Sequence, residues 1–259
     1  SIYLTGIINI VNKKQEINFM NVIITGATKG IGLAIAEKFA AEGFNLALNA
    51  RNVNDLKSLK KTFTEKFPNI EILVKKTDMS KKAQVQSFAK FVLSNWKSVD
   101  ILINNAGVFL PGEIAKEADG TLESQINTNL YSAYYLTRAI LPTMLKKSRS
   151  KKASNKKHIF NMCSIASQIA YPNGGSYSIS KFALLGFSKV LREEMKNKGV
   201  RVTSILPGAT WSNSWEGVDL PKSRLMLASD IANATWGAWT MSSSAVVEDI
   251  VIRPQLGDL

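Results

Sequence analysis

A tyrosine and a lysine stand four residues apart in the segment 174–181, and Ser164 lies thirteen residues before the tyrosine. Residues four apart share one face of a helix, so Tyr177 and Lys181 would project into the same site. A free tyrosine has a pKa of about 10, and a neighbouring ammonium favours the phenolate and lowers that pKa. The lysine would therefore bring the phenol closer to the useful range for acid–base catalysis, while the serine hydroxyl held a carbonyl oxygen. The pair alone is also compatible with an aromatic ring packed on a surface lysine.

A glycine-rich turn lies near the start of the chain, between an apolar run and a helical pattern. The run 22–24 is typical of a buried parallel strand, and apolar residues recur at helical spacing from Ile31. Glycines let the backbone approach a pyrophosphate, and a helix N-terminus offers unpaired N–H groups and a favourable dipole. With the spacing Gly-x-x-x-Gly-x-Gly, the pattern predicts a nucleotide-binding turn rather than a tight turn before an amphipathic helix. The candidate cofactor contacts of this turn are Gly26, Thr28, Lys29, Gly30, Ile31 and Gly32.

The second predicted strand, 45–50, is followed by an arginine. An acid at this strand end would bind the ribose hydroxyls of NAD, whereas an arginine accommodates the 2′-phosphate of NADP. Arg51 stands at this position, and Lys29 lies within the glycine turn. Two cations beside the adenosine ribose favour NADPH over NADH; the alternative is two solvated surface residues.

Several motifs in the same order make the chain resemble the short-chain dehydrogenase/reductase (SDR) family, in its single-domain branch, over about residues 20–259. The glycine turn resembles the cofactor motif of the family, 104–107 its Asn-Asn-Ala-Gly segment, and 207–210 the segment that approaches the nicotinamide. The resemblance implies an α/β fold: a three-layer α-β-α, doubly wound Rossmann domain with a seven-stranded, mainly parallel sheet. The cofactor contacts that it adds are Asp78 on the adenine ring, Asn105, Ala106, Gly107, Tyr177, Lys181, Pro207, Gly208, Thr210 and Ser212. Ser212 would replace a threonine of the family that binds the carboxamide, which is a departure from the pattern.

Four residues match the catalytic positions of the family: Asn129, Ser164, Tyr177 and Lys181. By resemblance, Tyr177 would donate a proton to the substrate carbonyl while hydride comes from the nicotinamide, and Ser164 would orient that carbonyl. Lys181 would lower the tyrosine pKa and hold the nicotinamide ribose, and Asn129 would hold a water of a proton relay. The implied activity is the NADPH-dependent reduction of a carbonyl to a hydroxyl.

Within the family, the chain most resembles the 3-oxoacyl-(acyl-carrier-protein) reductase group of fatty acid biosynthesis, which implies a small-molecule or acyl-thioester carbonyl as substrate. A substrate lid is expected over 211–226, lined by Trp211, Trp215, Leu220, Leu225 and Met226. Such an apolar lid suits acyl, steroid-like and aromatic ketones equally, so a sepiapterin-type reductase or a 3-hydroxy-acid dehydrogenase remains an alternative. A non-catalytic NADP-binding regulator is a further alternative, and the presence of all four catalytic positions argues against it.

The length of 259 residues suits one doubly wound domain over 20–259. The extension 1–19 is expected to be a short extra strand, a disordered arm or a product of upstream translation, because Met20 resembles an initiator. Strands are expected near 22–25, 45–50, 71–74, 100–103, 158–162, 201–205 and 249–252, with helices in most gaps. As in the family, helices around 122–145 and 176–198 would join subunits into a homotetramer or homodimer.

Composition narrows the class of protein further. No apolar run is long enough for a transmembrane helix, so neither a membrane span nor a membrane partner is expected. Cys163 is the only cysteine, so no disulfide can form within the chain, which suits a reducing cytoplasm. We expect Cys163 to be a small buried residue and His158, the only histidine, to begin a strand, so no metal site is expected.

The chain is strongly basic, with a net charge of +13, and part of this excess is local. The segment 146–157 contains seven basic residues and no acid, and removing it leaves about +6. Such a cluster could attract nucleic acid or an acidic carrier protein. It connects a helix to the start of a strand, however, at the end of the sheet opposite a cofactor crevice. A solvated loop is therefore favoured, and no nucleic-acid partner is expected.

Overall fold

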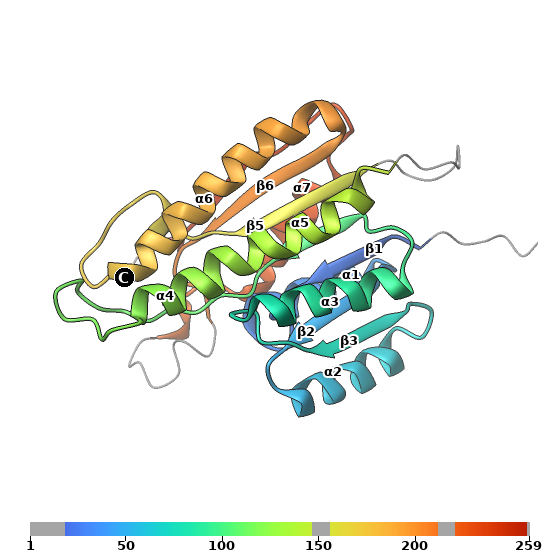
Figure 1. The fold of residues 1–259 in the computed structure, drawn as a ribbon, viewed down its shortest axis with the longest axis horizontal. Coiled ribbons are helices and arrows are strands. Elements are labelled where there is room, and N and C mark those ends of the chain that lie inside the picture. Colours follow the sequence, from blue (N-terminus) through green and yellow to red (C-terminus); the bar gives the residue numbers. More distant parts are fainter. Residues whose placement is uncertain (1–18, 147–155, 212–220, 258–259) are drawn as a thin grey trace, which may run out of the picture.

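The computed structural model describes residues 19–146, 156–211 and 221–257, which form a parallel sheet covered by helices on both faces (Figure 1). Its strand order is β3-β2-β1-β4-β5-β6-β7, and every pairing is parallel. The strands are β1 (Asn21–Ile24), β2 (Asn45–Ala50), β3 (Ile72–Lys76), β4 (Ile101–Asn104), β5 (Lys157–Met162), β6 (Val200–Pro207) and β7 (Asp249–Ile252). The predicted Rossmann fold is confirmed, and each strand lies within two residues of its predicted position. The extension, from residue 1 to 18, falls outside the described residues.

Successive side chains of the strands point to opposite faces of the sheet and enter two separate hydrophobic cores. In β1, Val22 and Ile24 pack into one core and Ile23 into the other, and all three are fully buried. The same alternation occurs in β2 with Leu46 and Ala47. Burial on both faces explains why these strands read as continuous apolar runs rather than as alternating patterns.

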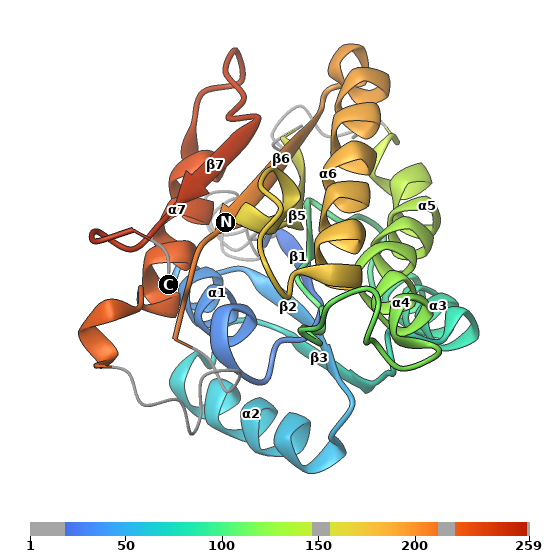
Figure 2. The ribbon, with the colours of Figure 1, turned by 90° about the vertical axis from the view of Figure 1, so that its left-hand side faces the viewer.

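Two layers of helices cover the sheet (Figure 2). On one face, α1 (Gly30–Ala41), α2 (Val53–Lys66) and α7 (Ala228–Thr240) supply side chains to the first core. On the other face, α3 (Lys82–Asn95), α5 (Ser132–Met144) and α6 (Gly175–Met195) supply the second. None of the helices in the described part of the chain is long and apolar enough to cross a membrane.

The connection from β4 to β5 contains a long irregular helix on this face. It begins as α4 (Thr121–Gln125), widens into a π-helical turn over Ile126–Tyr131 and continues as α5. Pro142 lies in the last turn of α5, which ends at Met144. π-helical turns are rare and frequently occur at functional sites, so this turn points to the end of the sheet that it borders.

The order of the strands reverses between β1 and β4, because the chain adds β2 and β3 on one side and β5 to β7 on the other. At such a switch point the connections diverge and leave a crevice at the carboxyl ends of the strands. The glycine turn follows β1, the segment 105–107 follows β4, Ser164 follows β5, and Gly208 follows β6. The topology therefore brings most predicted site residues to one edge of the sheet.

Candidate active site

The turn between β1 and α1 has a backbone conformation that favours glycine. Gly26 and Gly30 have φ angles of 65° and 54°, in the left-handed region. At Gly32, an added side-chain carbon would overlap the carbonyl oxygen of Gly26 and lie 2.5 Å from Nδ2 of Asn105. Asn105 holds the turn by donating from Nδ2 to the carbonyl oxygens of Thr25 (2.9 Å) and Gly26 (3.1 Å). Its predicted role as a cofactor contact is thus joined by a role in shaping the turn.

The N-terminus of α1 is open to a ligand. Its N-cap residue, Lys29, makes no side-chain capping hydrogen bond, and the first turn of the helix contains no acidic residue. The unpaired N–H groups and the positive end of the helix dipole favour an anion at this point. A glycine cradle that a side chain would fill, followed by an uncapped helix, fits the pyrophosphate of a dinucleotide.

Two cations stand where the adenosine half of a dinucleotide would extend from this turn. Arg51 follows β2 directly and is exposed, and Lys29 is also exposed. An acid that the sequence analysis did not place there lies close to Lys29: Asp55 Oδ2 is 3.9 Å from Lys29 Nζ. Burial raises the pKa of Asp78, but hydrogen bonds from Ser80 and the charge of Arg51 outweigh this effect, so that pKa lies below its ordinary value. Asp78 is therefore held as a carboxylate beside Arg51.

Tyr177, Lys181 and Ser164 come together at the carboxyl end of the sheet. Tyr177 and Lys181 lie one turn apart on α6, with the ammonium of Lys181 5.7 Å from the centroid of the tyrosine ring. Ser164, two residues after the end of β5, lies close enough to the phenol to oppose the rise of its pKa. Lys181 is 5% exposed, and its Nζ donates to the carbonyl oxygen of Met162 at 2.8 Å. The three predicted side chains thus form one site.

The acidity of the phenol differs from the prediction. Burial raises the pKa of Tyr177, and the hydrogen bond with Ser164 opposes this shift only in part. The net pKa of the tyrosine is thus raised and not lowered, because desolvation of the phenolate is the largest effect, and the contribution of Lys181 itself stays a prediction. Burial also lowers the pKa of Lys181 to about 8. Tyr177 is a neutral phenol at neutral pH and hence a proton donor.

Asn129, the fourth predicted catalytic residue, lies in the π-helical turn and fixes the backbone beside the site. Its Oδ1 accepts a hydrogen bond from the N–H of Val108 (2.8 Å), and its Nδ2 donates to the carbonyl oxygen of Val108 (3.0 Å). Nδ2 also donates to the hydroxyl of Ser180 (2.8 Å), which in turn donates to the carbonyl oxygen of Tyr177. The proposed water relay through Asn129 stays a prediction.

Two neighbouring residues were missed by the sequence analysis. Gln125, one helical turn before Asn129, makes the same double hydrogen bond to the backbone N–H and carbonyl of Leu110, at 3.2 Å each. Between the two clamped residues, Phe109 packs edge-on against the ring of Tyr177, with centroids 4.7 Å apart. The signal in the sequence was the four-residue spacing of Gln125 and Asn129, which places both amides on one face of a helix. Two such amides can bind alternate residues of an extended segment that runs alongside the helix.

The segment after β6 is only partly described. The hydroxyl of Thr210 donates to the carbonyl oxygen of Gly208 at 3.0 Å, and the N–H of Gly208 donates to the carbonyl oxygen of Ile252. The predicted contact Ser212 and the predicted lid residues Trp215 and Leu220 lie outside the described residues.

Two predicted lid residues have a different place in the structure. Leu225 and Met226 are 6% and 8% exposed, and Met226 packs in the core beneath α1 and α7. Met226 also pairs with the backbone of Trp211 and Ala209. The prediction that Met226 belongs to the lining of a substrate lid is therefore wrong, since its side chain packs in the core.

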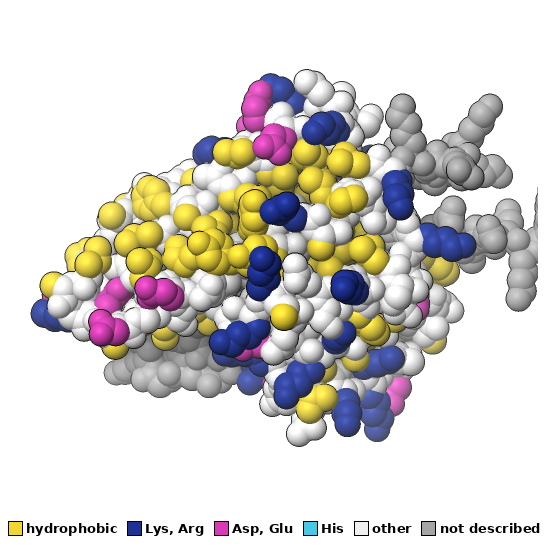
Figure 3. Space-filling view, viewed as in Figure 1, with side chains coloured by type: hydrophobic (Ala, Val, Ile, Leu, Met, Phe, Trp, Pro, Cys, Tyr) yellow, Lys and Arg dark blue, Asp and Glu magenta, His cyan; other side chains and the backbone are white. Residues whose placement is uncertain are grey.

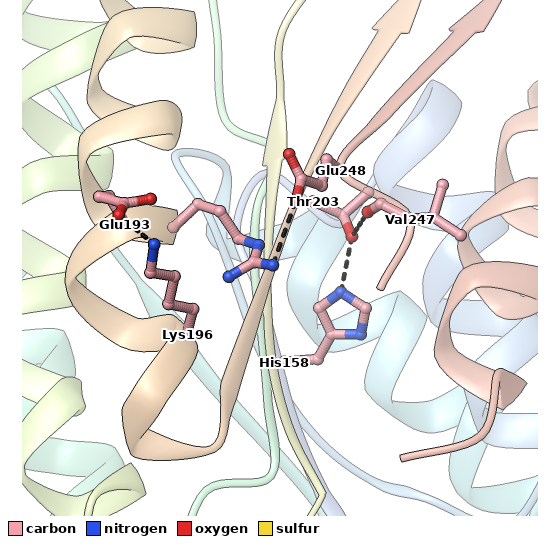
Figure 4. Close-up of polar contacts among 7 residues, drawn as sticks. His158, Glu193, Lys196, Thr203, Val247 and Glu248 are labelled. Carbon is pink, nitrogen blue, oxygen red and sulfur yellow. Dashed lines mark hydrogen bonds and ion pairs between the residues drawn. The ribbon is translucent and has the colours of Figure 1, made fainter. Parts of the chain in front are cut away.

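The single histidine and single cysteine have no catalytic geometry. His158 is fully buried in β5, where its Nε2 lies 2.7 Å from the hydroxyl of Thr203, which donates to the carbonyl oxygen of Val247 (Figure 4). Burial lowers the pKa of His158 well below its ordinary value. Burial raises the pKa of the Cys163 thiol to about 11, as expected for a small core residue. Among the described residues, no group of three acidic, histidine or cysteine side chains is placed to hold a metal.

Known proteins resemble this chain in sequence and in structure. A family model described as short chain dehydrogenase matches residues 20–220. Sepiapterin reductase of Chlorobaculum tepidum is 30% identical over 245 residues, which cover 92% of this chain and 97% of that protein. An NADP-dependent 3-hydroxy acid dehydrogenase of Salmonella typhimurium is 28% identical over 247 residues, covering 91% and 95% of the two chains. The structure of L-sorbose reductase from Gluconobacter frateurii, complexed with NADPH and L-sorbose, superposes with a TM-score of 0.80 at 27% identity, covering 91% and 95%.

Proposed function

The chain belongs to the short-chain dehydrogenase family, and from this premise we propose that it reduces the carbonyl group of a small molecule to a hydroxyl with NADPH. The observation that carries the proposal is the meeting of Ser164, Tyr177 and Lys181 at one end of the sheet. The glycine turn and the uncapped α1 follow the adjacent strand β1 at the same end.

In the proposed reaction, Tyr177 donates its phenolic proton to the carbonyl oxygen of the substrate. Its raised pKa supports this direction, because the group is protonated at neutral pH. The hydroxyl of Ser164 holds the carbonyl oxygen beside the phenol, and the buried cation of Lys181 stabilises negative charge as it develops there. The nicotinamide, when bound, supplies the hydride.

We propose that NADP is the cofactor and that Arg51 and Lys29 bind its 2′-phosphate. Both side chains are exposed cations beside the glycine turn, and guanidinium and ammonium groups both bind phosphate. The 3-hydroxy acid dehydrogenase is NADP-dependent by name, and the L-sorbose reductase structure contains NADPH. The backbone of the glycine turn and the first turn of α1 would hold the pyrophosphate.

The substrate that we propose is a free, small carbonyl compound. The relatives named above act, by their names, on sepiapterin, 3-hydroxy acids and L-sorbose, none of which is attached to a carrier protein. The aromatic ring of Phe109 is 42% exposed beside Tyr177 and would provide an apolar wall. None of these three relatives is named as a 3-oxoacyl-(acyl-carrier-protein) reductase, the group that the sequence was expected to resemble. An acyl thioester is therefore included among the substrates to be tested.

The test is NADPH oxidation by the purified chain, followed by absorbance, against sepiapterin, diacetyl, a 3-oxo acid, a ketose and an acetoacetyl thioester. Each substrate is measured with NADPH and with NADH. We expect turnover of a free carbonyl with NADPH and its loss in Tyr177→Phe. Preferred turnover of the thioester would move the proposal to the acyl-carrier group. NADPH binding without turnover of any substrate would favour the non-catalytic regulator instead.

We also propose that two copies of the chain pack through the outer face of α4, α5 and α6. Hydrophobic side chains gather along these helices in Figure 3, where a monomer would expose them to water. The exposed large hydrophobic residues on these helices and on the π-helical turn between α4 and α5 are Leu122, Tyr131, Tyr134, Ile179, Phe182 and Val190. Light scattering after size exclusion should give a dimer or tetramer for the wild type and a smaller species for Phe182→Lys. A monomeric wild type would contradict the proposal.

A further inference from the structure

Helix α6 carries Tyr177 in its first turn but begins without a capping group of its own. Its N-cap residue is Gly174, which has no side chain to accept a hydrogen bond, and the first turn contains no acidic residue. The first N–H groups of a helix have no partner within the helix, and the helix dipole places partial positive charge at that end. The position of Tyr177 therefore depends on the groups that satisfy this terminus from elsewhere in the chain.

Glu117, in the connection between β4 and α4, supplies the missing cap. Its Oε1 accepts a hydrogen bond from the backbone N–H of Ser176 at 2.8 Å, and its Oε2 accepts one from the Ser176 hydroxyl. Ser176 immediately precedes Tyr177 and is 3% exposed. A backbone hydrogen bond of 3.0 Å from Gly112 N–H to the carbonyl oxygen of Asn173 joins the same two segments. The connection is thus attached to the start of α6 at two points.

Two glycines leave room for the carboxylate. Gly175 has a φ of 33°, and a side-chain carbon there would overlap Oε1 of Glu117 and the carbonyl oxygen of Gly112. A side-chain carbon at Gly112 would lie 2.9 Å from Cγ of Glu117, although the backbone of Gly112 is not in the left-handed region. A small substitution at Gly112 would therefore push Glu117 away without straining its own backbone.

The same connection also touches the tyrosine ring. Its first residues are clamped by the amides of Gln125 and Asn129, and Phe109 between them packs on Tyr177. The cap by Glu117 holds the other end of the connection. The first turn of α6 is thereby held at two places: Phe109 packs against the ring of Tyr177, and Glu117 binds the backbone of Ser176.

We propose that Glu117 is a positioning residue for the reduction: its carboxylate holds Ser176 at the start of α6 and thereby fixes the hydroxyl of Tyr177. The inference rests on the proposed function, because it concerns the geometry of the proposed proton donor. Ser176 and Tyr177 are covalently joined, so a displacement of the first turn is passed on to the phenol. A displacement of about 1 Å can lower a rate by about a hundredfold.

The first experiment compares kcat and the Kd of NADPH in Glu117→Ala, Glu117→Gln and the matched control Glu113→Ala. Glu113 lies in the same connection and forms an exposed ion pair with Lys116 at 2.6 Å, so its loss removes a carboxylate but no cap. We expect kcat to fall about tenfold or more in Glu117→Ala, because the proton donor moves. It should fall no more than about twofold in Glu117→Gln, whose carbonyl can still accept from the N–H of Ser176. The control should keep the wild-type kcat, and the Kd of NADPH should be unchanged in all three.

Gly112→Ala tests the same contact without removing the carboxylate. The added methyl group should displace Glu117 and lower kcat about as far as Glu117→Ala does. The kcat of the double variant Gly112→Ala/Glu117→Ala should be no lower than that of Glu117→Ala alone, since both changes act through one contact. Losses that multiply in the double variant would overturn the inference.

Hydrogen exchange supplies a measurement that does not need a substrate. Amides of 174–180 should exchange faster in Glu117→Ala than in the wild type or in Glu113→Ala, whereas amides of 188–195 should not change. The proposed function stands if the wild type turns over a substrate and Tyr177→Phe abolishes that turnover. If kcat is then equal in Glu117→Ala and Glu113→Ala, the positioning role of Glu117 is overturned. Absence of wild-type turnover on every substrate would defeat the proposed function, and unchanged exchange at 174–180 would then also defeat the cap.

Discussion

Each end of the parallel sheet holds a lysine with little exposure, 11% for the side chain of Lys157 and 5% for Lys181, but the groups around the two lysines differ. At the amino end, Lys157 Nζ lies 2.6 Å from Oδ1 of Asp100, and the other oxygen of that carboxylate accepts from the N–H of Asn21 at 2.8 Å. At the carboxyl end, Lys181 donates to a backbone carbonyl, and no ion pair involves it among the described residues. A buried pair is closed and structural, whereas a buried cation without a counter-ion costs stability and is available to a ligand or a reaction.

Replacing Lys181 should produce the largest effect and should separate activity from stability. We expect Lys181→Met to lower kcat/KM about a thousandfold, within the range for losing a group that acts on proton transfer. The variant should unfold at an equal or higher denaturant concentration at pH 7, because a buried charge is replaced by an apolar chain.

The pH dependence checks the cause of this stability change. The folded pKa of Lys181 is about 8, below its ordinary 10.5, so the unfolded chain binds more protons between these values. The free energy of unfolding of the wild type should therefore rise, relative to that of Lys181→Met, as the pH increases from about 8 to 10.5. A variant that is less stable than the wild type at every pH would show that Lys181 is part of a structural pair, as Lys157 is.

Replacing Asp100 should have the opposite pattern at the amino end. Asp100→Asn leaves the largely enclosed ammonium of Lys157 without a counter-ion, and we expect a loss of about 3 kcal/mol in the free energy of unfolding with kcat unchanged. Asp249→Asn is the matched control, because the Lys189–Asp249 pair is more exposed and should contribute less than about 1 kcal/mol. A fall in kcat in Asp100→Asn with little change in the free energy of unfolding would contradict the assignment of the amino end to structure and the carboxyl end to activity.

Replacing Arg51 tests whether the exposed cations at the carboxyl end serve a ligand. We expect Arg51→Ala to raise the KM for NADPH about tenfold, with the KM for NADH and the stability nearly unchanged. Lys57→Ala, on the exposed surface of α2, controls for the general loss of positive charge. Equal losses for both cofactors would assign Arg51 to structure rather than to the 2′-phosphate.

The smallest expected effect concerns His158 at the amino end. Because burial lowers its folded pKa, the unfolded chain binds more protons once the pH falls below about 6.5, and stability falls with it. Between pH 7 and 5.5, the wild type should lose about 1 kcal/mol more in the free energy of unfolding than His158→Gln, with equal kcat at pH 7. Parallel denaturation profiles in the two proteins would mean that His158 titrates normally in the folded state.

Much of the fold was readable before the structure, because its signals are local. A strand buried on both faces is a short apolar run, and this pattern located β1, β2 and β4 to within two residues. The turn that begins α1 was readable for the same reason, since left-handed φ angles at Gly26 and Gly30 select glycine regardless of the rest of the chain.

The candidate site was readable in its residue types but not in its energetics. The spacing of Tyr177 and Lys181 places both on one face of α6, but it does not specify how deeply they are buried. The sign of the tyrosine pKa shift follows from that burial, which depends on β5, α6 and the connection after β4 together. The interpretation of Met226 as part of a lid failed for the same reason, since its place in the core depends on packing against α1 and α7.

The contacts that hold the site in place join residues that are far apart along the chain. Glu117 and Ser176 are separated by 59 residues, and neither residue type marks the other. Spacing and residue type were sufficient for the strands, the glycine turn and the family, because periodicity and backbone conformation are properties of neighbouring residues. Burial, the direction of each pKa shift and the cap of α6 required the folded chain, because desolvation and long-range hydrogen bonds depend on which distant segments the topology brings together.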